Sequence, residues 1–207
     1  MSKREKEIRF GDIQFRNQEE SDEHLYIEGY AIVWDTETLI GSEDYGYYEQ
    51  IARMALKNAH KSDVVARYNH NDTNYILGRT RNGSLELIED DYGLKVIIRL
   101  QKNVQAHVDL YNMVRSGLID KMSFAFTIKE GGRTIMRDSN GRIHTVVNEI
   151  DRLFDVSPVD VPAYSSTSIY ARSVSEVETE LLAVETVSAP SCEKRDYELD
   201  IIISMYK

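Results

Sequence analysis

The segment DKMSFAF combines the pattern of a buried strand with one hydroxyl group that could do chemistry. Met122, Phe124 and Phe126 alternate, so they should share one face of the strand, which we expect to be buried. Ser123 and Ala125 then point to the opposite face, where both side chains are small. Close packing of a neighbouring segment would explain small residues there. The alternative is that the Ser123 hydroxyl is a nucleophile, which requires a base within hydrogen-bond reach.

The candidate base is His70, in the segment RYNHNDTNYILGRT. It ends a predicted strand, and its polar neighbours Asn69, Asn71 and Asp72 could fix the imidazole ring by hydrogen bonds. On this local context alone, a structural histidine is the more common outcome. His107 belongs to a predicted helix and is expected to be exposed or at the edge of its apolar stripe.

A third group must orient the base, and the segment RIHTVVNEIDRLFDVS offers His144, Glu149, Asp151 and Asp155. If residues 143–150 form one unbroken strand, His144 and Glu149 point to opposite faces and cannot enter the same site. A lone glutamate on a strand is usually an exposed charge. Glu149 and His144 therefore remain alternatives at this point.

A metal site is a different interpretation of the same residues. His70, Asp72 and Glu149 are chemically adequate ligands, although no pair at i and i+4 is present among them. The sequence has no Gly-rich phosphate loop, paired CxxC or HExxH motif. We therefore expect neither a metal nor a cofactor.

The elements that must position these residues are mostly strands of six to ten residues. They are expected at 7–16, 25–34, 63–70, 76–80, 84–89, 93–100, 122–128, 133–138, 142–150 and 153–161. Apolar residues at helical spacing predict one helix over 47–62. A second helix should follow an Asn103 cap and end at Gly117. This pattern favours a mainly β fold with helices (α+β), a closed or curled antiparallel β-barrel decorated by about two or more helices.

The composition divides the chain of 207 residues into a domain over 1–172 and an acidic C-terminal tail over 173–207, removable or scaffold-binding. A net charge of −10 argues against a nucleic-acid partner. No apolar run approaches the roughly 20 residues that span a membrane. The charged N-terminus lacks the apolar core of a signal peptide, and the single Cys192 suits a reducing compartment.

With Ser123, His70 and Glu149 in view, the chain resembles the phage prohead proteases of the HK97 type, which are related in fold to the herpesvirus assemblins. Four segments carry the resemblance over about residues 8–172: YEQIARMALKNA, YNHNDTNYILGRT, GLIDKMSFAF and NEIDRLFDVSPVDVPAYSST. The last contains the V-S-x-V-x-x-P-A signature, which is the most specific of the four.

The resemblance implies a serine endopeptidase with Ser123 as nucleophile, His70 as general base and Glu149 as orienting acid. His144 is the competitor for the third role, because assemblins use a second histidine there. Arg152 is the matching candidate for holding an oxyanion water. The substrates implied are the major capsid protein or a scaffold protein, and the enzyme itself. The implied location is the host cytoplasm inside the immature capsid, with a possible homodimer. A catalytically silent barrel that binds scaffold or capsid is the alternative.

Overall fold

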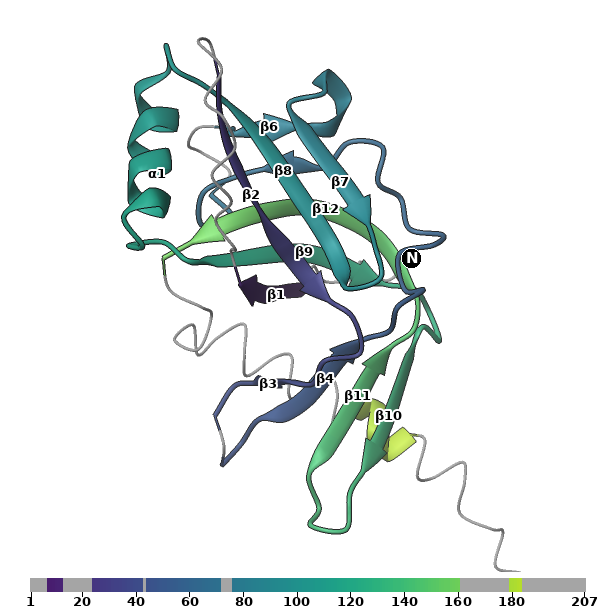
Figure 1. Ribbon diagram of the computed structural model, residues 1–207. Helices are drawn as coiled ribbons and strands as arrows, with labels where there is room; N and C mark the ends of the chain where they lie inside the picture. Colours follow the sequence, from purple (N-terminus) through teal and green to yellow (C-terminus); the bar gives the residue numbers. More distant parts are fainter. Residues whose placement is uncertain (1–6, 13–23, 43, 72–75, 161–178, 184–207) are drawn as a thin grey trace, which may run out of the picture.

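The computed structural model describes residues 7–12, 24–42, 44–71, 76–160 and 179–183 (Figure 1). The largest sheet contains, in spatial order, β1 (Glu7–Asp12), β9 (Lys121–Ile128), β12 (Ile150–Val159), β5 (Val65–Ala66) and β6 (Gly78–Arg79). The second sheet contains β10 (Arg133–Arg137), β11 (Ile143–Val147), β4 (Tyr47–Ile51) and β3 (Thr38–Ile40). The third contains β2 (His24–Val33), β8 (Gly93–Gln101) and β7 (Leu85–Glu89). The helices are the 3-10 helix η1 (Thr80–Asn82), α1 (Gln105–Arg115) and a short segment at 179–183.

The expected closed or curled antiparallel barrel is wrong. Over the described ranges the strands form three separate sheets, and none of them closes on itself. Two of the sheets are also mixed, because β12 pairs with β5 in parallel and β11 pairs with β4 in parallel. The prediction of a mainly β chain with helices agrees with the structure. Strand patterns report which face of a strand is buried, but they do not report which strands pair, so closure could not be deduced from them.

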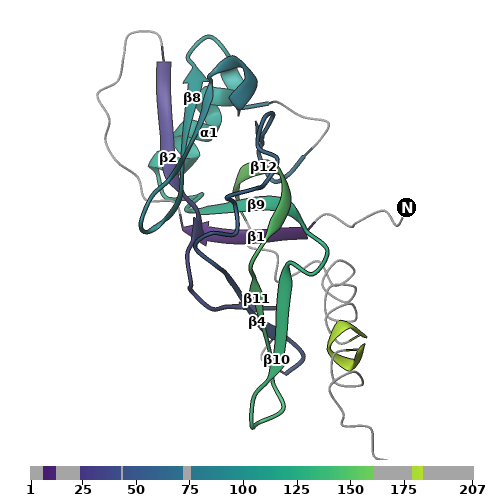
Figure 2. The same ribbon diagram turned by 90° about the vertical axis from the view of Figure 1, so that its right-hand side faces the viewer.

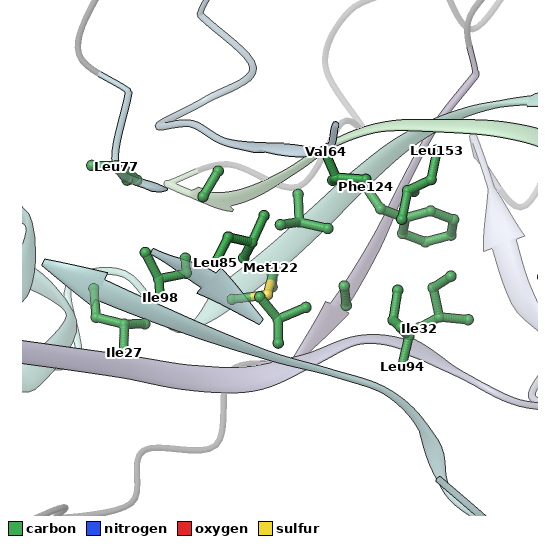
Figure 3. Packing of buried hydrophobic residues seen from close by; sticks show 14 of the residues in the cluster. Ile27, Ile32, Val64, Leu77, Leu85, Leu94, Ile98, Met122, Phe124 and Leu153 are labelled. Carbon is green, nitrogen blue, oxygen red and sulfur yellow. The ribbon is translucent and has the colours of Figure 1, made fainter. Parts of the chain in front are cut away.

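The main hydrophobic core lies between the five-stranded and the three-stranded sheet (Figures 1 and 3). Met122 and Phe124 of β9 and Leu153 of β12 point into it from one side. Ile27 of β2 and Ile98 of β8 meet them from the other side. The alternating apolar residues of β9 therefore form its buried inner face, as the sequence predicts. This packing fixes the strand that carries Ser123.

The helix predicted over 47–62 is wrong. Tyr47–Ile51 is the strand β4, and turns follow it over 53–58. Tyr47, Glu49 and Ile51 are buried at a period of two, and β4 lies between β3 and β11. Met54, which completes the expected helical stripe, is 60% exposed. Tyrosine and isoleucine favour strands, and pairing on both edges of β4 outweighs the short helical periodicity.

The second predicted helix is confirmed as α1. Its apolar stripe is buried through Leu110, Tyr111 and Val114. Gly117 has φ = +74°, the left-handed conformation expected just after a helix. The N-terminal cap is Val104 rather than Asn103, and its side chain makes no capping hydrogen bond. None of the helices described is long and apolar enough to cross a membrane.

The four-stranded sheet extends away from the main core and receives residues 179–183 beside β10 (Figures 1 and 2). Leu181 is buried there in a small separate cluster with Tyr47 and Ile143. Glu180 lies 3.7 Å from the largely buried guanidinium of Arg133. This part of the predicted acidic tail is thus helical and packed on the sheet, and the other residues of the tail lie outside those described.

Candidate active site

Ser123 lies on the face of β9 that points away from the main core. Its neighbours Met122 and Phe124 belong to the core cluster, and alternation along the strand turns Ser123 and Ala125 to the other side. Ser123 pairs with Ser157 of the adjacent strand β12. Both serines are fully buried, so this second face is covered rather than solvated.

A β-bulge in β12 brings Asp155 to the same face as Ser123. Leu153 pairs with Phe126, and Asp155 pairs with Ala125, the next residue of β9 toward Ser123. Phe154 is therefore an extra residue in the ladder. Without this insertion, Asp155 would share the core face of Leu153, because residues two apart point the same way. With it, Leu153 faces the core and Asp155 lies beside Ala125, only 1% exposed. The bulge therefore places a carboxylate one strand away from the serine.

His70 is held beside β12 by the chain that follows β5. The backbone N–H of Arg67 donates to the carbonyl of Val156 at 3.0 Å, and that of Asn69 donates to Pro158 at 3.1 Å. Asn69 and His70 both have left-handed backbones, with φ values of 52° and 54°. This conformation is common for asparagine and costly for histidine, and such residues concentrate at functional sites.

Side chains anchor the same loop at the end of β12. Asn69 Oδ1 accepts a hydrogen bond from the backbone N–H of Asp160 at 3.1 Å. The Tyr68 hydroxyl donates to Asp160 Oδ2 at 3.2 Å. Burial raises the pKa of Tyr68, and the neighbouring Asp160 carboxylate adds to the effect. The phenol therefore stays a hydrogen-bond donor at neutral pH, and the loop that carries His70 has several fixed points.

The imidazole of His70 joins the serine and the carboxylate. Its Nε2 lies 2.6 Å from Ser123 Oγ, and its Nδ1 contacts Asp155 Oδ1. A carboxylate at Nδ1 favours the tautomer with the proton on that nitrogen, so Nε2 is left to accept the hydroxyl proton of Ser123. The structure thus brings together two of the three residues selected from the sequence, Ser123 and His70, and adds Asp155.

Glu149, the third residue selected from the sequence, is not near His70. It lies in the connection between β11 and β12, where its carboxylate is about two-fifths exposed and pairs with Lys129. The following residue, Ile150, pairs with Ile128, five positions along β9 from Ser123, or about 17 Å at the rise of a strand. The expected contact between Glu149 and His70 is therefore absent, and Asp155 takes its place.

His144, the competitor of Glu149, and Arg152, the expected oxyanion residue, also lie elsewhere. His144 Nδ1 is 2.7 Å from Glu37 Oε1, and its ring stacks on Tyr48 in the four-stranded sheet. Arg152 pairs with Thr127, and its guanidinium lies over the ring of Phe154. Neither residue is brought to Ser123.

The metal interpretation gains no support from the described part of the chain, where no group of three or more His, Cys, Asp or Glu residues could hold an ion. Both ring nitrogens of His70 already contact protein groups, Ser123 and Asp155. Glu149 is elsewhere, and Asp72 lies outside the described residues.

A hydroxyl, an imidazole and a carboxylate in contact in this order are the arrangement of serine hydrolases that use a triad. Residues 11–180 match the family described as Caudovirus prohead serine protease, and the chain belongs to this family. It is accordingly a serine protease of phage capsid maturation, which acts in the procapsid within the host cell. No curated protein and no solved structure matches the chain.

Proposed function

We propose that the chain is an endopeptidase in which Ser123 is the nucleophile, His70 the general base and Asp155 the acid that orients the base. The observation that carries the proposal is the 2.6 Å contact between His70 Nε2 and Ser123 Oγ, with Asp155 at the other ring nitrogen. Asp155 replaces Glu149 in the role that the sequence suggested, because Glu149 pairs with Lys129 instead.

The reaction is acyl transfer to the serine. His70 removes the hydroxyl proton of Ser123 as the oxygen attacks a peptide carbonyl, and it then gives this proton to the leaving amine. Asp155 holds the productive tautomer and stabilises the imidazolium that forms. Water then attacks the acyl-enzyme, with His70 again acting as the base. A positioned base of this kind contributes on the order of 10²–10⁴-fold.

The family implies that capsid or scaffold proteins are the substrates. We further propose that the major capsid protein or a scaffold segment is cut in the assembling shell, and that the protease cuts itself. The sequence after residue 183 is a candidate internal substrate on composition alone, because residues 191–200 are mostly polar and charged, as at many sites of proteolysis.

The test is to compare the wild-type protein with Ser123→Ala and with Ser116→Ala, whose exposed hydroxyl lies at the end of α1. A fluorophosphonate probe should label the wild type and Ser116→Ala on Ser123, and it should not label Ser123→Ala. Intact-mass measurements after incubation at high concentration should show loss of a C-terminal fragment in the same two proteins. Absence of labelling on Ser123 in the wild type, with no difference in mass among the three chains, would contradict the proposal and favour a purely binding role.

A further inference from the structure

We propose that Ser157 is a positioning residue that holds the carboxylate of Asp155 in line with His70. The inference rests on the proposed function, since it assigns Ser157 a part in the same site. Ser157 Oγ donates a hydrogen bond to Asp155 Oδ1 at 3.1 Å. The same oxygen contacts Nδ1 of His70. Asp155 Oδ1 therefore contacts both the His70 imidazole, which the carboxylate orients, and the Ser157 hydroxyl, which holds the carboxylate.

The backbone around Ser157 is fixed on both sides. Ser157 pairs with Ser123 across the strands β12 and β9, two residues after Asp155 and beyond the bulge. The following residue, Pro158, accepts a hydrogen bond from the loop that carries His70. The Ser157 side chain is fully buried, and its hydroxyl donates to Asp155, so we assign it to holding the carboxylate rather than to contacting a substrate. These contacts hold the backbone of Ser157 beside Asp155, and its hydroxyl points to the carboxylate.

The chemical reason for a second donor is the burial of Asp155. A carboxylate removed from water needs hydrogen bonds to remain charged, and bonds to a charged acceptor are about twice as strong as neutral ones. A donor beside the His70 contact also stops rotation of the carboxylate away from Nδ1. Without the Ser157 hydrogen bond, the charge of the Asp155 carboxylate is less well stabilised, so the carboxylate attracts the His70 imidazolium more strongly. The orientation of the carboxylate is also less restricted.

The experiment measures the rate of fluorophosphonate labelling of Ser123 as a function of pH and probe concentration. Ser157→Ala should lower the maximal labelling rate by roughly tenfold or more, the usual range for a lost bond to a charged group. The probe concentration for half-maximal rate should change by less than about twofold, because Ser157 does not contact the probe. The acid limb of the pH profile should move to higher pH. Ser157→Thr retains the hydroxyl and should restore most of the rate.

The matched control is Thr145→Val, in the four-stranded sheet. Thr145 is also buried, and its Oγ1 donates to the buried carboxylate of Glu49 at 3.4 Å. Thr145→Val therefore removes a buried hydroxyl-to-carboxylate bond outside the site, and it should leave the labelling rate and pH profile unchanged. Thermal unfolding of all variants shows which ones remain folded.

The outcomes separate this inference from the proposed function. Slower labelling with a shifted profile in Ser157→Ala, recovered in Ser157→Thr, supports the positioning role. Wild-type rates in Ser157→Ala would overturn it and leave the proposed function intact. An equal loss in Thr145→Val, or a loss with no shift of the profile, would also overturn it, since a general loss of stability would suffice. If wild-type Ser123 is not labelled at all, the proposed function itself fails.

Discussion

Asp155 and His70 are 85 residues apart in the chain, and their side chains meet through Asp155 Oδ1 and His70 Nδ1. Two local features make the contact. The bulge at Phe154 turns Asp155 out of the core face of β12, and the left-handed backbone at Asn69 and His70 turns the imidazole toward the strand. Both features depart from regular strand geometry, as is often the case beside active sites.

Asp155→Asn should lower the rate of Ser123 labelling by about 10³–10⁴-fold, because an amide at this position favours the wrong tautomer of His70. Glu149→Gln is the matched control, since it removes a carboxylate from the same segment of the chain but one that pairs with Lys129. Its rate should stay within about twofold of the wild type, as for other surface changes. The converse result, a large loss in Glu149→Gln and none in Asp155→Asn, would restore the assignment suggested by the sequence.

The sequence selected Ser123 and His70, which the structure brings into contact, and it offered Asp155 only as one of several possible acids. Strand parity argued against Asp155. Regular alternation places Asp155 on the same face as Leu153, which is in the core. Only the extra residue Phe154 reverses this, and a bulge leaves no reliable mark on a single sequence. A usable signal was present two residues later, because Ser157 is a second polar residue at the same parity, between apolar residues at 156 and 158.

Most strands of the fold could also be predicted, while their assembly could not. Alternation marks the inner face of β9 correctly, and the helical stripe marks α1. The prediction for Tyr47–Ile51 was wrong because five residues fit both a helical and a strand period, and pairing with β11 decides between them. The prediction that His107 is exposed or at the edge of the helical stripe was wrong for a similar reason. The residue is buried, and its burial depends on contacts with distant segments.

His107 is buried and should contribute to stability through two partly buried hydrogen bonds. Its Nδ1 accepts from the backbone N–H of Gln101 at 3.0 Å, and its Nε2 donates to the carbonyl of Ile76 at 3.1 Å. His107→Leu leaves both backbone groups without this partner and should lower the free energy of unfolding by about 1–3 kcal/mol. His60→Leu, at an exposed position, should change it by less than about 0.5 kcal/mol. Urea denaturation of the Ser123→Ala protein measures both, and equal effects would contradict the prediction.

The packing of residues 179–183 on the four-stranded sheet can be tested with two adjacent leucines. Leu181 is 2% exposed beside Tyr47 and Ile143, whereas Leu182 is 59% exposed. Leu181→Ala should destabilise this contact by about 2–3 kcal/mol, near the low end for buried leucines because the cluster is small. Hydrogen exchange should become faster in β4 and β11 for Leu181→Ala. Leu182→Ala should behave as the wild type. Similar exchange rates in both variants would argue that residues 179–183 do not pack on the four-stranded sheet.

His144 should make the stability of the four-stranded sheet depend on pH. The hydrogen bond with Glu37 raises the pKa of His144 above its ordinary value of 6.5, and Asp138 adds to the effect. Because the raised pKa belongs to the folded state, the stabilisation is fully present below pH 6.5 and is lost as the pH rises through the raised pKa. The difference in unfolding free energy between the wild type and His144→Gln should therefore be larger at about pH 5.5 than at about pH 9. Glu37→Gln should reduce that pH dependence, since it removes the main partner. A difference that stays constant across this range, or one that grows with pH, would show that protonated His144 does not hold Glu37 in the folded protein.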